Sequence, residues 1–230
     1  MSLGVDLIQE VKSILSNEWS EREGQKVPES EDLRLGNEAV KLEGTVLYAD
    51  LDASTNLVDE YKPFFAAEIY KSYLHCVAKI VRSEGGIITS YDGDRIMAVY
   101  IGDYKNSSAA QTALKINYTV LKIINPAIEK QYSNNYIIRQ VVGIDTSPLF
   151  VARTGIRGSN DLVWVGRSAN YAAKLTTLSS EYASRITEDV YHRLNKTAKY
   201  SNENRSMWEK VTWSTMNDMT IYRSNWLWDI

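Results

Sequence analysis

Hydrophobic positions along the 230-residue chain change their spacing several times, and each change predicts a new element. Residues 5–17 place apolar side chains three or four apart, which predicts a short amphipathic helix. Residues 44–51, GTVLYADL, form an apolar run that predicts a strand. Residues 63–86 return to helical spacing and end in two glycines, a signal for a helix stop.

The pattern continues with alternating strand and helix signals. The apolar runs at 86–92 and 95–102 are joined by an Asp-Gly pair, which predicts a hairpin. A second long helix is expected over 107–131, opened by capping serines and disturbed near Pro126. The remaining expected elements are a strand pair at 136–145 and 147–154, a polar loop, a helix at 166–180, a strand at 183–187 and a short helix at 188–196.

The order strand, helix, hairpin, helix, hairpin, helix predicts an α+β fold with helices on one face of a largely antiparallel sheet. Three parts are expected along the chain. Residues 1–40 hold the first helix and then a charged stretch with Gly and Pro, read as a linker or arm. Residues 41–197 form the main domain. Residues 198–230 form a terminal hairpin and a Trp-rich segment, which we expect to pack on the domain or on another subunit.

Composition excludes several classes of partner. The formal net charge is -3, which gives no overall attraction to nucleic acid or to an anionic membrane. No apolar run reaches the length needed to cross a bilayer, and the N-terminus lacks a signal-peptide core. Cys76 is the one cysteine, so no intrachain disulfide can form. We therefore expect a cytoplasmic protein, in which Cys76, His75 and His192 have structural roles.

Two carboxylates are the candidate catalytic groups of the chain. Asp50 ends the first strand, and Asp94 lies in the turn of the following hairpin. Strands of this order are usually neighbours, so the two anions can converge and would then need a cation. Mg²⁺ and Mn²⁺ are bound by a few carboxylates together with substrate phosphates, which makes a nucleoside triphosphate the natural partner. In the alternative interpretation, which the spacing alone favours, Asp50 caps a helix and Asp94 is an ordinary turn residue.

Three segments together resemble the class III nucleotidyl cyclases. They are VLYADLDASTNL at 46–57, GGIITSYDGDRIMAVY at 85–100 and GRSANYAAKL at 166–175, and they occur in the order found in that family. The resemblance covers residues 42–195. It implies a cyclase catalytic domain with a ferredoxin-like antiparallel sheet covered by helices. It also implies a head-to-tail homodimer, because in this family the metal aspartates and the Asn with its basic residue come from different subunits.

The resemblance also implies roles for individual residues and a reaction, attack of the ribose 3′-oxygen on the α-phosphate, which gives a 3′,5′-cyclic nucleotide and diphosphate. Two divalent ions, Mn²⁺ or Mg²⁺, are the implied cofactors. The implied site consists of Asp50, Asp94 and the Leu51 carbonyl for the metals, Ala53, Ser54, Thr55 and Arg157 for the phosphates, Asn170 for the ribose, and Lys174 for charge stabilisation. Lys210 is a further phosphate candidate in a poorly matching region. Without the resemblance, Asn170, Lys174 and Arg157 would be read as ordinary surface side chains.

The base-reading positions depart from those of most family members. Ser90 and Val163 stand where members that use ATP carry a lysine and an aspartate, and the pair that reads guanine is absent too. Tyr48, Tyr91 and Trp164 flank the same region with large side chains, which favours a small base. This departure resembles the Pycsar pyrimidine cyclases of bacterial antiphage defence, whose cyclic UMP or cyclic CMP activates a separate effector protein. We expect UTP rather than CTP as the substrate.

Three alternatives stay open. In the first, the chain is an adenylyl cyclase with atypical base recognition. In the second, it is an inactive nucleotide-binding module, and in the third, a purely structural interaction domain. Retention of Asp50 and Asp94 argues against the inactive module. Asp52 lies at a position that the family leaves variable, and we expect it to cap the helix that follows.

Overall fold

The computed structural model describes residues 2–132 and 134–230. Contacts divide the chain into two compact units. The first holds residues 1–43 and 148–166, and the second holds residues 44–147 and 167–230. Two long strands, β2 (Glu38–Leu51) and β5 (Gln140–Ile156), contribute residues to both units. The three-part division expected from the sequence stays a prediction.

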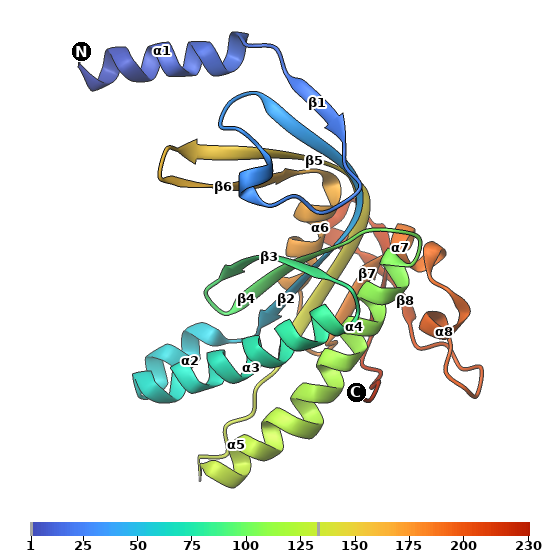
Figure 1. The fold of residues 1–230 in the computed structure, drawn as a ribbon. Coiled ribbons are helices and arrows are strands. Elements are labelled where there is room, and N and C mark those ends of the chain that lie inside the picture. Colours follow the sequence, from blue (N-terminus) through green and yellow to red (C-terminus); the bar gives the residue numbers. More distant parts are fainter. Residues whose placement is uncertain (1, 133) are drawn as a thin grey trace. The chain divides into compact units, whose positions relative to one another are not determined.

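The first unit contains the segment expected as a linker or arm. Residues 20–40 include β1 (Ser20–Glu23) and η1 (Ser30–Asp32), and β2 begins at Glu38, earlier than the predicted strand. β1 pairs in parallel with the start of β2. The end of β5 pairs antiparallel with β6 (Ser159–Val165) to form a hairpin, visible in Figure 1.

The predicted strand pair at 136–145 and 147–154 is wrong. Residues 140–145 of the first run and all of the second belong to the single strand β5, and the stretch expected as a polar loop contains β6. Pro148 cannot donate a backbone hydrogen bond, but it lies between residues 142–144, which pair with β7, and residues 150–156, which pair with β6, so the strand continues through it. The true turn lies at Arg157 and Gly158, where Gly158 has a φ of +85°.

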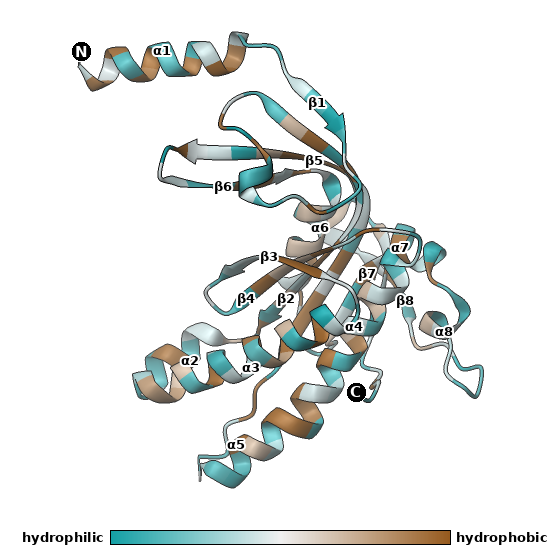
Figure 2. Cartoon of the chain, viewed as in Figure 1, coloured by the Kyte–Doolittle hydropathy of each residue, from teal (hydrophilic) through white to brown (hydrophobic). Residues whose placement is uncertain are grey.

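Helix α1 (Leu3–Ser16) confirms the predicted N-terminal helix but buries none of its side chains. Its apolar stripe is visible as brown bands in Figure 2. Leu3 and Leu15 are 73% and 81% exposed. The side chain of Asn37 donates hydrogen bonds to the carbonyls of Ile14 and Asn17, which ties the end of α1 to the start of β2.

The second unit is built on a sheet with the strand order β3-β4-β2-β5-β7-β9-β8. β2 is antiparallel to β4, and β4 to β3, whereas β5 and β7 are parallel. The strands not yet given bounds are β3 (Ile87–Asp92), β4 (Arg95–Tyr100), β7 (Ser184–Thr187), β8 (Glu209–Trp213) and β9 (Met219–Ser224). The predicted α+β fold with a largely antiparallel sheet is confirmed.

The helices of this unit follow the predicted order. They are α2 (Ser54–Glu60), α3 (Pro63–Ser83), α4 (Lys105–Thr119), α5 (Asn125–Gln131), α6 (Arg167–Thr176), α7 (Glu188–Arg193) and α8 (Lys196–Lys199). The predicted disturbance near Pro126 is present as η2 (Val120–Ile124), a π-helical turn between α4 and α5. A short 3₁₀ turn, η3 (Ser214–Met216), joins β8 to β9.

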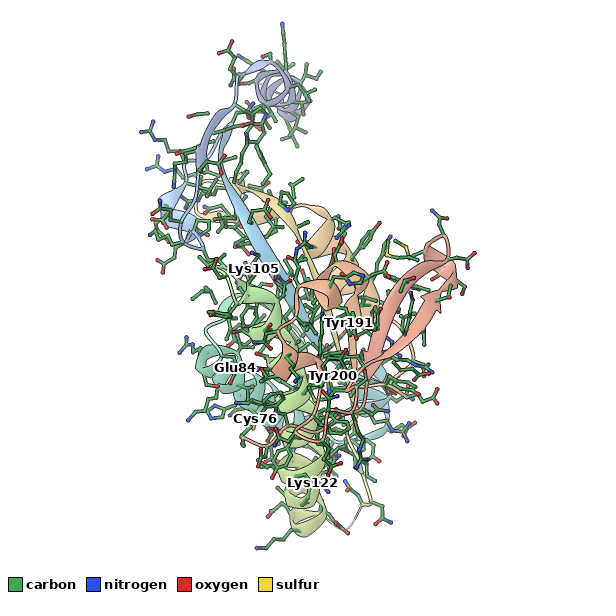
Figure 3. The ribbon with its side chains drawn as sticks, turned by 90° about the vertical axis from the view of Figure 1, so that its right-hand side faces the viewer. Cys76, Glu84, Lys105, Lys122, Tyr191 and Tyr200 are labelled. Carbon is green, nitrogen blue, oxygen red and sulfur yellow. The ribbon has the colours of Figure 1, made fainter. Side chains whose placement is uncertain are left out.

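Helices cover both faces of the sheet, so the expectation that they lie on one face is wrong. On one face α3, α4 and α7 enclose the main core, whose largest buried side chains include Tyr73 and Leu114. An ion pair of 2.7 Å between Glu84, labelled in Figure 3, and Lys115 joins the end of α3 to α4. On the other face α6 lies against β5 so closely that a Cβ at Gly143 would come within 2.2 Å of the Ala172 carbonyl oxygen.

The C-terminal segment packs on the second unit. Trp226 and Trp228 are partly buried against the main core, and the Trp228 amide donates to the Leu114 carbonyl of α4. The Asn117 side chain donates to the carbonyls of Asn225 and Trp226. Within the described ranges 2–132 and 134–230, no helix is long and apolar enough to cross a membrane.

Candidate active site

Asp50 lies in a row of charged side chains across three strands. The register places Asp50 of β2 opposite Arg95 of β4, and Arg95 opposite Asp92 of β3. The Arg95 guanidinium donates to Asp92 at 3.0 Å and lies 3.9 Å from Asp50 Oδ2. Burial alone would lower the pKa of Arg95, but the hydrogen bond to Asp92 and the charges of Asp50 and Asp92 leave it raised.

A second row lies two residues along the same strands. Met97 of β4 is opposite both Tyr48 of β2 and Ser90 of β3, so the predicted base-reading residue Ser90 and the large side chain predicted to flank the base lie on either side of one methionine. The Tyr48 hydroxyl lies 3.1 Å from the Met97 sulfur, and the Arg95 guanidinium lies 5.6 Å from the centre of the Tyr48 ring. Because residues two apart on a strand share a face, both rows lie on one face of the sheet. Residues 48, 90 and 95 therefore line the surface next to Asp50.

Asp50 and Asp94 are close enough to repel each other. Burial and the charge of Asp94 raise the pKa of Asp50, although Arg95 and the hydroxyl of Thr176 oppose the shift. Asp94 follows Gly93 in the two-residue turn between β3 and β4, and its Oδ2 is buried without a hydrogen-bond partner. A buried carboxylate oxygen without a partner is costly, so the pair is incompletely compensated.

Tyr73 of α3 adds a second incompletely paired group. Its side chain is fully buried, and its hydroxyl has no hydrogen-bond partner. Burial, together with the charges of Asp50 and Asp94, raises the pKa of Tyr73 well above its usual value. The phenol is therefore held neutral, with a free O–H donor, in the neighbourhood of the two carboxylates.

These observations fit a divalent cation at the two aspartates. Repelling carboxylates with an unpartnered buried oxygen are hard oxygen ligands of the kind that Mg²⁺ and Mn²⁺ take. In the part of the chain that the structure describes, no group of three or more His, Cys, Asp or Glu side chains is gathered. The two aspartates would therefore need further oxygen ligands from a backbone carbonyl and from a bound phosphate.

The loop after β2 differs from the expectation in one respect. Leu51 is buried at the end of β2, and Ala53 precedes α2 with a φ of +56°, in the left-handed region. Ala53 is the N-cap residue and α2 has no side-chain cap, so the prediction that Asp52 caps this helix is wrong. Instead the Asp52 amide donates to the Arg139 carbonyl at 2.9 Å, because the chain turns back toward β5. Ser54 and Thr55 form the first turn of α2.

Helix α6 is anchored at its first residue. Arg167 donates from Nε and Nη2 to the carboxylate of Asp145 at 3.0 and 3.2 Å, and also to Asp189 of α7. Asp145 is fully buried and accepts a further hydrogen bond from Thr187. Burial raises the pKa of Asp145, while Thr187 and Arg167 oppose the shift. This network fixes where α6 begins relative to β5 and β7.

The two faces of α6 carry different groups. Asn170 and Lys174 are one helical turn apart and exposed, and the Lys174 ammonium lies 3.8 Å from the Met216 sulfur. Thr176 is 6% exposed, and its hydroxyl lies 3.3 Å from Asp50 Oδ2. At about 100° per residue, Thr176 is roughly 200° around the helix from Lys174. Asn170, six residues before Thr176, is roughly 120° around the helix from it. Asn170 and Lys174 therefore both lie on the exposed side of α6, away from the side that contacts Asp50 of the same chain.

The remaining predicted residues belong to other elements of the chain. Arg157 and Val163 belong to the β5–β6 hairpin of the first unit, where both are exposed. Lys210 of β8 forms an exposed ion pair of 3.6 Å with Glu188. Asp50, Asp94, Tyr48 and Ser90 belong to one unit and share one edge or face of its sheet.

Two residues of this site were missed by the sequence analysis. Arg95 directly follows Asp94, so a basic side chain next to one of the two candidate carboxylates could have been noted from the sequence. Thr176 follows Lys174 by two positions and resembles any threonine at a helix end. Nothing in the sequence indicates that it contacts Asp50.

Comparison with known proteins places this geometry in a family. Residues 40–222 match the model described as the adenylate and guanylate cyclase catalytic domain. The chain belongs to this family. It is a nucleotidyl cyclase of the class III type, as its three motifs indicated.

Two curated relatives are similar over their whole length. A uridylate cyclase from Xanthomonas perforans is 55% identical over 232 residues, and one from Burkholderia cepacia is 52% identical over 232 residues, with 100% of each chain covered in both cases. Among solved structures, the adenylyl cyclase CyaB from P. aeruginosa matches with a TM-score of 0.67 at 18% identity. The match covers 81% of this cyclase and 95% of that chain, and it supports the fold.

Proposed function

We propose that this cyclase converts UTP to 3′,5′-cyclic UMP and diphosphate. The observation that carries the reaction is the pair of repelling carboxylates, Asp50 near the end of β2 and Asp94 in the turn between β3 and β4. The names of the relatives that are 55% and 52% identical support uridine as the nucleoside. In the reaction a bond forms between the ribose 3′-oxygen and the α-phosphorus, the bond from that phosphorus to diphosphate breaks, and the 3′-hydroxyl proton leaves.

Different residues of the chain would have different roles in this displacement. Asp50, Asp94 and the Leu51 carbonyl would hold two Mn²⁺ or Mg²⁺ ions. Such ions lower the pKa of a hydroxyl and stabilise negative charge on a leaving phosphate. Residues 53–55 would donate to the triphosphate oxygens, with Arg157 as a further contact. Asn170 would orient the ribose, and Lys174 would stabilise charge that develops on the phosphates in the transition state.

The opposite faces of α6 support a head-to-tail homodimer. Since Asn170 and Lys174 point away from their own Asp50, a complete site needs these two residues from a second copy. A twofold dimer would then contain two such sites. Mixing an N170A chain with a D94A chain tests this directly. Each variant alone is expected to be inactive, and the mixture to recover up to about a quarter of the wild-type activity, since half of the dimers then carry one complete site.

The side chains beside Asp50 support uracil rather than cytosine. Arg95 presents N–H donors next to Tyr48, and its Nε is buried without a partner. Donors of this kind match the O4 carbonyl of uracil, whereas cytosine has an amino donor at the same position. A buried donor left without an acceptor costs about 1–3 kcal/mol. The hydroxyl of Ser90 lies across Met97 from Tyr48 and can pair with either base.

A panel of nucleoside triphosphates tests the proposed substrate. The purified protein is incubated with Mn²⁺ and, separately, with UTP, CTP, ATP or GTP, and the cyclic products are separated by chromatography. Cyclic UMP is the expected dominant product. Cyclic AMP as the main product would favour an atypical adenylyl cyclase, and nucleotide binding without diphosphate release would favour an inactive module.

The product would act as a messenger in the cytoplasm, where nucleoside triphosphates are abundant. The resemblance to the Pycsar cyclases supports an effector protein that binds cyclic UMP as part of an antiphage response. Expression of the chain in cells, with and without Asp94→Ala, followed by measurement of cyclic UMP and of phage plaques, tests this role. Equal plaque numbers for both forms would contradict it.

A further inference from the structure

Thr176 is the contact between α6 and the metal carboxylates of the same chain. Its hydroxyl lies 3.3 Å from Asp50 Oδ2 and 2.8 Å from the Ala173 carbonyl oxygen. A hydroxyl has one proton and can donate it to only one of these acceptors at a time. The oxygen therefore stands between the backbone of α6 and the carboxylate, and it can shift its proton toward either.

The surroundings of Thr176 restrict its movement. The side chain is buried, and α6 packs against β5 at Gly143 with no space for a Cβ. At the other end of the helix Arg167 is fixed to Asp145. The helix has ten residues, which is about 15 Å of rise, and both ends are tied to the sheet. A shift of the Thr176 side chain would therefore move α6 as a rigid body, together with the residues on its exposed face.

We propose that Thr176 is a positioning residue that couples the two active sites of the dimer. This inference rests on the proposed split site. On one face α6 contacts Asp50 of its own site through Thr176, and on the opposite face it offers Asn170 and Lys174 to the site of the partner chain. The state of one metal carboxylate thereby affects the placement of the ribose-binding residue in the other site.

The neighbouring Thr177 supplies a matched control. Its hydroxyl donates to the Lys174 carbonyl at 2.8 Å, which is the same backbone bond that Thr176 makes one residue earlier. Thr177 is exposed and makes no contact with Asp50 among the described residues. The pair T176V and T177V therefore removes the same hydroxyl from the same helix end, with and without the carboxylate contact.

The first experiment uses the homodimer. We expect T176V to weaken Mn²⁺ binding about tenfold or more, as is typical for groups that orient a metal ligand, while T176S and T177V stay near wild type. Mn²⁺ binding is read from the electron paramagnetic resonance signal of free Mn²⁺ without nucleotide, and thermal unfolding checks the fold. T176A removes the same hydroxyl with less bulk and is made in parallel. Equal Mn²⁺ binding by T176V, T176A and T177V would overturn the proposal.

The second experiment separates local positioning from coupling. In a heterodimer of a D94A chain and an N170A chain, purified through two different tags, the one complete site combines the aspartates of the N170A chain with Asn170 of the D94A chain. T176V in the N170A chain should weaken Mn²⁺ binding at that site. T176V in the D94A chain should leave Mn²⁺ binding unchanged and lower kcat or raise KM by about threefold or more, since α6 of that chain donates Asn170.

The outcomes distinguish the two proposals. A heterodimer that is inactive with Thr176 intact would contradict the split site itself. An active heterodimer in which T176V affects only the N170A chain would overturn the coupling, because Thr176 would then act on its own Asp50 alone. An active heterodimer that T176V leaves unchanged in both chains would overturn the positioning role as well.

Discussion

Asp50 and Arg95 face each other across β2 and β4, and Arg95 Nη1 lies 3.9 Å from Asp50 Oδ2. The contact joins the two parts of the proposed site, because Asp50 is a proposed metal ligand and the Arg95 guanidinium lies over the ring of Tyr48. A change at either residue is therefore expected to affect both metal binding and base recognition.

Replacing Arg95 tests base recognition. We expect Arg95→Ala to lower kcat/KM for UTP by about tenfold or more and to lower kcat/KM for CTP less. The reason is that the variant removes an N–H donor, and only uracil has an acceptor, O4, at the position that this donor would face. Steady-state rates with both nucleotides measure the ratio. Arg82→Ala, at an exposed arginine of α3, is the control and should leave the ratio as it is. An unchanged ratio in Arg95→Ala would contradict the assignment.

Replacing Asp50 tests whether the carboxylate pair is strained without metal. Asp50→Asn removes the repulsion from Asp94 and keeps the shape of the side chain. In the presence of a chelator we expect the melting temperature to rise by about 2–4 °C, the shift that roughly 1 kcal/mol produces in a protein of this size. Mn²⁺ should raise the melting temperature of the wild type and not of the variant. A variant less stable than the wild type with chelator present would argue against strain.

The pH dependence of stability follows from the same group. The pKa of Asp50 in the folded chain is raised from its ordinary value of 3.8, chiefly by burial and then by Asp94. The folded state therefore favours the protonated form, and the stability that this form contributes is lost as pH rises through the folded pKa. Without metal, the stability advantage of Asp50→Asn over the wild type should grow as pH rises from 3.8 through the folded pKa. A constant difference across this range in chemical denaturation would contradict the prediction.

The anchor of α6 gives a prediction about folding energy. Asp145→Asn weakens the bonds to Arg167 inside the protein, and we expect the free energy of unfolding to fall by about 1–3 kcal/mol. Asp189→Asn removes the exposed partner of the same arginine and should cost no more than about 1 kcal/mol. Urea denaturation of both variants gives the comparison. Equal losses would show that the buried contact is not the stronger of the two.

Helix α1 should contribute little to the stability of the monomer. Because its side chains are all exposed, Leu15→Gln is expected to change the free energy of unfolding by less than about 0.5 kcal/mol. Leu114→Ala, in the core of the second unit, should cost about 2–5 kcal/mol. Guanidinium denaturation under conditions that keep the chain monomeric measures both. A large loss in Leu15→Gln would mean that α1 is covered in solution.

The sequence predicts those features that depend on local pattern. Asp50 and Asp94 could be placed because an apolar run marks the first strand and an Asp-Gly pair marks the hairpin, and neighbouring strands then bring their ends together. The division between residues 145 and 147 was wrong because polar residues between two apolar runs resemble a turn whether or not the chain continues in the same direction. The Thr176 contact lay beyond prediction because it depends on how α6 is rotated against β2, which no local pattern encodes.

The base-reading residues show the same limit. Ser90 could be identified by resemblance and Tyr48 by its size, but the sequence does not show that both flank Met97, which depends on the register of three strands. Arg95 was missed because its charge has a ready local explanation, the bond to Asp92 in the same hairpin. The distance to Asp50 becomes visible only when β2 and β4 are aligned.

Ala53 is held in a left-handed backbone conformation with a φ of +56°. A residue with a Cβ pays about 1–2 kcal/mol in this region, and glycine pays almost none. Ala53→Gly should therefore remove this strain from the folded loop, while glycine also gives the unfolded chain more conformational freedom to lose. The turn that would receive the triphosphate is thus held by its surroundings against the backbone preference of its own residue, and the strain is already present before any ligand arrives.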